Sequence, residues 1–405
     1  MGTSGVIVRA VNALTARWAQ TAPTGSGTVF SAAGVWPLLA FLAAGADGGA
    51  RQELTEAVGL PAGQAAGAAR HMLASLDAMR GVDAAVGMWT GRTLELREEW
   101  LADIPLGALG VLTGDPEADA SALDAWASKR TGGQIDRMPL RPDGNTEFVL
   151  ASALALRTEW FRPFTEGLLW PESGPWEGRG LAALHRTTSL LDRVGVAWTP
   201  AGTVTELKVL GDTGIDVHLL LGEDGMSPGQ VLGAGVDILA RTRAVLPGTR
   251  LPYGDAGPGL SVRRVRHPRP TPPTLNVTTV PFSVSARHDL LDQSPLFGLT
   301  TATTDKEEGH FPGIGSRPLK IQNGAQAATA TFGALGFRAA TVAAFAMTAS
   351  GVPEERYLTT EVDATFDRPF GFLAVHRTSR LVLAAGWVTD PEPYREDEFS
   401  STPWA

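Results

Sequence analysis

The sequence predicts an α+β fold, and three observations lead to this class. The first half carries apolar residues at helical spacing, whereas the second half carries short β-prone segments next to Thr, Asp, Gly or Pro. Helices followed by strands are typical of an α+β layout rather than a doubly wound sheet. The 47 glycines and 28 prolines are scattered along the chain, as expected when turns join many short elements.

The helices come first. An amphipathic helix is expected over residues 6–20, because Arg9 and Asn12 interrupt its apolar run. Further helices are expected over 34–44, 51–58 and 120–130, the last with Leu123, Trp126 and Ala127 at helical spacing. Strands are expected over 204–210, 216–221, 261–265, 275–280 and 371–375.

The composition excludes several classes of protein. The net charge is −9, which argues against a general nucleic-acid binder, since such a protein needs a basic face. The chain has no cysteine, so disulfides, thiolate metal sites and cysteine nucleophiles are excluded. The seven histidines have no metal-ligand spacing, and we expect no metal and no cofactor. Without a clear signal peptide or membrane span, the expected location is the cytoplasm.

One short motif suggests chemistry that its neighbours argue against. Residues 225–229, Gly-Met-Ser-Pro-Gly, match the nucleophile elbow of hydrolases. Pro228 would remove a backbone N–H that the oxyanion hole of such an enzyme needs. We therefore expect Ser227 to cap a helix that begins at Pro228, and we expect no catalytic residue.

Several segments, taken in order, resemble the serpin family in its bacterial type. The segments that carry the resemblance are Phe30-Ser31, Leu38-Leu39-Ala40, Leu123-Asp124-Ala125-Trp126, Thr131-Gly132-Gly133-Gln134-Ile135, Leu150-Ala151-Ser152-Ala153-Leu154, Trp160 with Phe164, Val280-Pro281-Phe282, Phe297-Gly298-Leu299, His310-Phe311-Pro312-Gly313-Ile314, Phe366-Asp367-Arg368-Pro369-Phe370 and Gly386-Trp387-Val388-Thr389-Asp390-Pro391. The chain departs from the family pattern at Ala32, Gly34, Ser152 and Gln326.

The resemblance implies a serpin fold: a large mixed β-sheet, smaller sheets, about eight or nine helices and a long exposed reactive loop. One serpin-like domain is expected over residues 1–391, followed by an acidic, disordered tail over 392–405. The loop is expected over residues 336–368, where a target serine protease would cleave it. Its N-terminal part would then insert into the main sheet as a new strand. We expect the protein to be a monomer that binds neither nucleic acid nor membranes.

The hinge of this loop departs from the inhibitory pattern of the family. The hinge positions are Gly336, Phe337, Arg338, Ala339, Ala340 and Thr341. Inhibitory members have acidic residues before the Gly, then a small Thr or Ser, then Glu. Phe337 is the largest departure, because overpacking one large side chain costs about 1–3 kcal/mol, and ~1.4 kcal/mol in a barrier changes a rate tenfold.

Two further points stay open from the sequence. Counting from the hinge places the scissile bond near Ser350, counting back from Pro369 places it near Leu358, and Arg356 between them would suit a trypsin-like protease. The function is therefore either protease inhibition, binding by a non-inhibitory serpin scaffold, or a scaffold repurposed as a small-molecule enzyme or carrier for a small apolar ligand.

Overall fold

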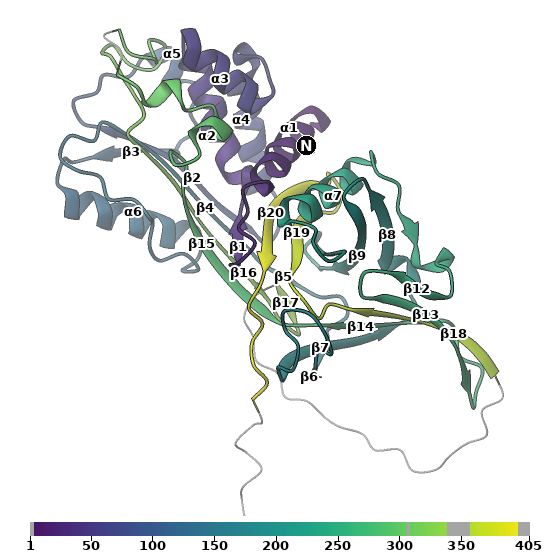
Figure 1. Cartoon of the computed structure of the whole chain (residues 1–405). Helices are drawn as coiled ribbons and strands as arrows, with labels where there is room; N and C mark the ends of the chain where they lie inside the picture. The colour runs from purple at the N-terminus through teal and green to yellow at the C-terminus, as the bar shows by residue number, and fades with distance from the viewer. Residues whose placement is uncertain (1–3, 306–307, 338–356, 396–405) are drawn as a thin grey trace, which may run out of the picture.

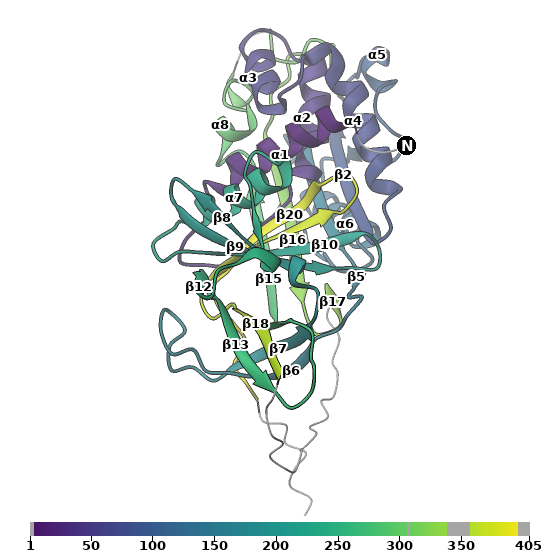
Figure 2. The same cartoon turned by 90° about the vertical axis from the view of Figure 1, so that its right-hand side faces the viewer.

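The computed structural model describes residues 4–305, 308–337 and 357–395 of the 405-residue chain. Helices from the first quarter of the chain gather at one end of the molecule, and two of the sheets fill the other (Figures 1 and 2). The expected α+β class is confirmed. Within the described part of the chain, no helix combines the length and hydrophobicity that a membrane span requires.

The main sheet has five strands in a mixed arrangement. In spatial order they are β15 (Phe282–Asp289), β16 (Asn323–Phe332), β4 (Phe148–Leu156), β2 (Val82–Gly91) and β3 (Leu109–Leu112). The two central strands, β16 and β4, run parallel, with partners from Asn323↔Val149 to Ala328↔Leu154. Every residue of β4 is buried, as expected for a strand covered on both faces.

A seven-stranded antiparallel sheet packs beside the main sheet. Its order is β1 (Thr28–Phe30), β20 (Leu381–Val388), β19 (Phe370–His376), β10 (Ile215–Gly222), β9 (Gly202–Leu210), β8 (Val194–Thr199) and β11 (Leu246–Pro247). The closing motif seen in the sequence forms the β19–β20 hairpin, in which Phe370 pairs with Val388. Both strands are almost wholly buried.

A third sheet of six strands lies at the far end. Its order is β12 (Gly254–Gly257), β13 (Leu260–His267), β18 (Tyr357–Thr365), β14 (Thr274–Thr279), β7 (Leu181–Thr188) and β6 (Thr165–Leu169). A two-stranded unit, β5 (Thr158–Glu159) with β17 (Gly336–Phe337), sits at the end of β4. Pro393 bridges to Leu181, and the amide of Tyr394 donates to the carbonyl of Gly180. The chain therefore contacts the body beyond the expected boundary at 391, while residues 396–405 lie outside the described residues.

Eight α-helices occur in the described chain. They are α1 (Gly5–Ala19), α2 (Ala32–Gly45), α3 (Gly48–Val58), α4 (Ala62–Asp77), α5 (Glu98–Leu101), α6 (Pro116–Arg130), α7 (Pro228–Ala240) and α8 (Ser294–Phe297). Three 3₁₀ turns complete the set: Leu191–Arg193, Gly248–Arg250 and Thr301–Thr303. Helix α2 is apolar all round and buried, because α1, α3 and α4 surround it on one side and the sheets on the other.

The expected hydrolase-like motif forms the start of α7. The Ser227 side chain accepts a hydrogen bond from the Gln230 amide, and the Gln230 side chain accepts one from the Ser227 amide. Pro228 occupies the first turn. This capping box confirms the interpretation of Ser227 as a helix cap.

Candidate functional site

The described residues cover both ends of the expected loop. Residues 336–337 form β17 and residues 357–365 form β18, whereas residues 338–356 lie outside the described residues. The chain leaves the end of the main sheet at Phe337 and returns in the six-stranded sheet at Tyr357. Of the hinge residues, Gly336 and Phe337 are described, whereas Arg338, Ala339, Ala340 and Thr341 lie outside the described residues.

Phe337 is already packed in the protein core. Its side chain is 1% exposed, and its ring centroid lies 6.1 Å from that of Phe372. Strand β17 runs antiparallel to β5, with Gly336 opposite Glu159 and Phe337 opposite Thr158. A Cβ added to Gly336 would come within 2.3 Å of the Thr158 carbonyl oxygen, so this close approach requires glycine. The first two hinge residues thus form a separate two-stranded unit with β5, just beyond the end of β4.

Trp160 holds the turn that precedes the hinge. Its indole Nε1 donates a 2.9 Å hydrogen bond to the carbonyl of Gly333, and its ring lies 5.0 Å from that of Phe332. The Trp160 amide donates to the carbonyl of Leu335, and the Gly333 amide donates to the carbonyl of Gly336. These contacts fix where the chain leaves β16 and turns back toward β4.

Three of the four departures from the family pattern meet beside Ser31, beneath the β4–β16 pair. We call Ser31, Gly34, Ser152 and Gln326 the seam cluster; all four are buried. The Gln326 side chain accepts from the Ser31 amide at 2.7 Å and donates to the Ser31 carbonyl at 2.8 Å. Its Nε2 also lies 3.3 Å from Ser152 Oγ on the facing strand. Gly34 fits here because a Cβ would lie 2.5 Å from Ser152 Oγ.

His288 lies on β15, opposite Gln326 on β16. Its Nε2 makes a 2.8 Å hydrogen bond to the carbonyl of Val29, so this nitrogen carries a proton. Burial lowers the pKa of His288 below its ordinary value of 6.5, although the bond to Val29 acts in the opposite direction. The neutral ring is therefore the form that the folded protein favours.

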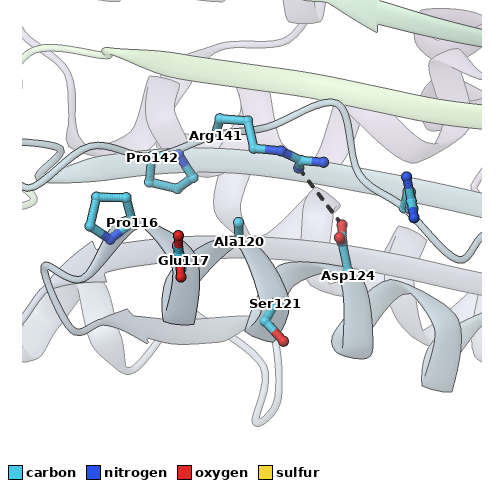
Figure 3. Close-up of a pocket in the computed structure, with 8 residues that line it drawn as sticks. Pro116, Glu117, Ala120, Ser121, Asp124, Arg141 and Pro142 are labelled. Atoms are coloured by element: carbon cyan, nitrogen blue, oxygen red, sulfur yellow. Dashed lines mark ion pairs between the residues drawn. The ribbon is translucent and has the colours of Figure 1, made fainter.

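Helix α6 and the segment after it cover the other face of the central strands. Leu123 and Ala127 of α6 pack on a surface of small residues from β4 and β16, namely Ala151, Ala153, Ala325 and Ala327. A shallow pocket of about 500 Å³ separates α6 from the following segment. Figure 3 shows Asp124 of α6 facing Arg141 across it, with 4.0 Å between their charged groups. The Asp124 carboxylate also accepts from the Met138 amide at 2.7 Å.

Of the three candidate scissile residues, only Leu358 lies among the described residues. Leu358 lies in β18, pairs with Arg266 of β13 and has a 62% exposed side chain. Ser350 and Arg356 lie outside the described residues. Because a protease binds its substrate as an extended segment free of other pairing, Leu358 is the least suited of the three. The choice between Ser350 and Arg356 stays a prediction.

Sequence reasoning singled out the unusual residues at 34, 152 and 326, but it missed the contacts between them and the contact that holds the turn before Gly336. The Trp160–Gly333 contact links positions 173 residues apart, and no local pattern signals it. No group of three or more metal-ligating side chains occurs within residues 4–305, 308–337 and 357–395.

Comparison with known proteins finds similarity to one family model and to several solved structures. Residues 10–171 match a family model described as serpin (serine protease inhibitor). Human thyroxine-binding globulin complexed with thyroxine is 17% identical, with a TM-score of 0.70 over 96% of this chain and 99% of that one. The thermophilic serpin tengpin in its native state is 13% identical, with a TM-score of 0.71 over 95% and 94%. A serpin from the trematode Schistosoma haematobium is 14% identical, with a TM-score of 0.66 over 95% and 100%.

A search of curated proteins found no match. Because the identities to the solved structures are low, those likenesses show the fold alone. They confirm the expected architecture of a large mixed sheet with smaller sheets and helices around it.

Proposed function

We propose that this chain, which has the serpin fold over its described residues and matches the serpin family model over residues 10–171, inhibits a serine protease as a suicide substrate. The protease would cleave the segment between Phe337 and Tyr357, and the N-terminal part of that segment would enter the main sheet between β4 and β16. The protease serine would remain bound as an acyl-enzyme, so the inhibitor needs no catalytic residue.

The observation that carries this proposal is the pairing of β17 with β5. A strand inserted beside β4 would run antiparallel to it, which is the direction in which Gly336 and Phe337 already run against Thr158 and Glu159. Continuing that register places Ala339 opposite Leu156 and Met347 opposite Phe148, so that the nine residues of β4 would all gain a partner. No proline interrupts residues 338–347.

The energetics favour insertion once the segment is cut. Entry of the strand would break the short β4–β16 ladder and form two antiparallel ladders in its place. A net gain of about nine hydrogen bonds at ~0.5–1.5 kcal/mol each amounts to roughly 5–14 kcal/mol. The seam cluster opposes opening, because separating the strands breaks the contact between Gln326 and Ser152. Before cleavage the native state would therefore be held by a kinetic barrier.

The test is to mix the protein with trypsin-, chymotrypsin- and subtilisin-like proteases. Inhibition predicts an SDS-resistant covalent adduct with at least one of them, and the mass of the released C-terminal fragment identifies the scissile bond. The matched control is Thr341→Pro, because proline cannot pair inside a central strand. That variant is expected to be cleaved at the same bond without forming an adduct. Cleaved products alone, with all three proteases, would refute inhibition.

A second candidate is a non-inhibitory serpin scaffold that binds a ligand. Phe337 favours it, because a large side chain stands where the inhibitory pattern of the family has a small Thr or Ser. Thyroxine-binding globulin, a protein of the same fold, is described in complex with thyroxine. This candidate predicts cleavage of the segment without the large rise in thermal stability that insertion brings. A repurposed small-molecule enzyme remains the third interpretation. For each of the three, we propose a monomer in the cytoplasm.

A further inference from the structure

Strands β13 and β18 end in a two-stranded ribbon that extends beyond their neighbours in the six-stranded sheet. The edge strand β12 pairs with β13 only over residues 260–262, and β14 pairs with β18 only from Glu361 onward. Among the described residues, 264–267 of β13 and 357–360 of β18 therefore pair with each other alone. Figure 1 shows the free ends of these two strands on the side of the molecule away from helices α2 to α5.

The acidic side chains of β18 are already paired on one face of this ribbon. Arg263 donates to the Asp363 carboxylate from Nε at 3.0 Å and from Nη2 at 2.7 Å. The side-chain amide of Asn276 donates to the same carboxylate at 3.1 Å, and His267 Nε2 lies 3.2 Å from Glu361. Neither carboxylate is therefore left to pair with the arginines of the other face.

The opposite face of the ribbon carries two arginines without a carboxylate partner. Arg264 and Arg266 lie on this face because side chains alternate along a strand. Both are exposed, and neither forms an ion pair within the described chain. The guanidinium group of Arg264 lies over the ring of Tyr253, 4.8 Å from its centroid, and the Tyr253 hydroxyl hydrogen-bonds to Thr360 at 3.1 Å. Two uncompensated positive charges thus stand side by side on a protein whose net charge is −9.

Apolar side chains are exposed beside these arginines. Leu358, which pairs with Arg266, is 62% exposed, and Tyr253 is 53% exposed. Val262 and its partner Val362 lie on the same face but are buried, so the face emerges from the protein core just beyond them. Exposed Tyr and Arg side chains gathered in one patch are typical of protein–protein interfaces. We call this patch the basic face; it consists of Tyr253, Arg264, Arg266 and Leu358.

The position of the basic face in the chain indicates the kind of partner that it would meet. Tyr357 is the first described residue after segment 338–356 and pairs with His267 at the tip of the ribbon. Leu358 of the basic face follows directly, and the candidate scissile residue Arg356 precedes it by two positions. A protease that cuts within segment 338–356 is therefore held next to the basic face.

We propose that the basic face docks an acidic surface of the protease that cuts segment 338–356. Arg264 and Arg266 would pair with carboxylates of that protease, while Tyr253 and Leu358 would contact the apolar groups around them. The two arginines would speed association, because complementary charges steer two proteins together, whereas the rest of this acidic chain repels an acidic partner. The inference rests on the proposed cleavage of this segment, but it does not depend on whether cleavage traps the protease.

The experiment compares the anionic and the cationic isoforms of trypsin, which cut after the same residues but carry opposite net charge. For each isoform, kcat/KM is measured for cleavage within segment 338–356, and the masses of the fragments identify the cut. The double substitution Arg264→Glu with Arg266→Glu is expected to lower kcat/KM of the anionic isoform about tenfold or more at low ionic strength. The kcat/KM of the cationic isoform should not fall. At about 1 M sodium chloride, where charges are screened beyond about 3 Å, the effect on the anionic isoform should shrink to about twofold or less.

The matched control is Arg9→Glu with Arg51→Glu, which changes the net charge by the same amount at exposed positions of α1 and α3. It should lower kcat/KM of the anionic isoform by less than about twofold, because these charges lie away from the ribbon. Arg264→Lys with Arg266→Lys should keep most of the rate, since both positive charges remain. All of these positions are exposed, so Tm should change by less than about 1 °C in each variant.

The outcomes separate this inference from the proposed function. An equal fall in kcat/KM with both trypsin isoforms would overturn the docking proposal, and so would a fall of the same size in the control variant. Cleavage of the segment would stand in both cases. Absence of any cut within residues 338–356 would instead refute the proposed function and, with it, the docking of a protease on the basic face.

Discussion

Replacing Phe337 by alanine tests whether the hinge is part of the core before any cleavage occurs. The side chain is 1% exposed and packs near Phe372, so its removal leaves a cavity. Phe→Ala substitutions in cores cost about 3–5 kcal/mol. Because β17 has only two residues and lies where the chain leaves the sheet, we expect a loss at the lower end, about 3 kcal/mol.

The corresponding change in Tm is modest because the chain is long. An unfolding entropy of about 2.1 cal/mol/K per residue gives about 0.85 kcal/mol/K for 405 residues. A loss of about 3 kcal/mol therefore lowers Tm by about 3–4 °C. Calorimetry of Phe337→Ala before cleavage measures this shift. The matched control is Phe161→Ala, because Phe161 follows closely after β5, the partner strand of β17, but is 61% exposed, and its Tm should change by less than about 1 °C.

The same variant separates two interpretations of the hinge. The sequence suggests that Phe337 obstructs insertion, in which case Phe337→Ala would sharply increase the yield of protease adduct. The pairing of β17 with β5 indicates instead that Phe337 keeps its place when the following residues insert. We then expect equal losses of Tm in the uncleaved and cleaved forms, and a change in adduct yield of less than about tenfold. An unchanged Tm in the uncleaved form would refute the reasoning.

Three other predictions concern the contacts around the central strands. Gln326→Ala should lower the free energy of unfolding in urea by about 2–4 kcal/mol, because the buried amide of Ser31 loses its acceptor and the Ser31 carbonyl keeps only the Gly34 amide as a donor; a loss below about 1 kcal/mol would contradict this role. Trp160→Phe should lower the free energy of unfolding in urea by about 1–3 kcal/mol, because the Gly333 carbonyl loses its donor. An unchanged urea concentration at the unfolding midpoint would show that water replaces the indole. The lowered pKa of His288 means that the unfolded chain binds more protons below pH 6.5, so stability should fall as pH drops through that value. His288→Gln should reduce this loss, as followed by urea unfolding between pH 5 and 8, and an unaltered pH profile would exclude His288 as its source.

Local patterns in the sequence predicted four helices and five strands, and each of these nine elements occurs in the structure. The expected helix over 120–130 belongs to α6, Pro116–Arg130, whose start at a capping Asp115 was missed by four residues. The expected strand over 371–375 belongs to β19, Phe370–His376. These segments were predictable because their periodicity reflects which face is buried.

The seam cluster shows what the sequence alone could not provide. Gly34, Ser152 and Gln326 appeared as three separate departures from the family pattern, without an indication that they touch. In the fold, Gln326 bonds to the backbone of Ser31, and Gly34 leaves room for Ser152. Hydrogen bonding between residues almost 300 positions apart depends on strand pairing, which the sequence does not specify locally.

The sequence by itself determined the α+β class and the family resemblance, because these depend on periodicity and on ordered motifs. Only the tertiary structure decided the state of the hinge, since the burial of Phe337 depends on β5 and on Phe372 of a distant strand.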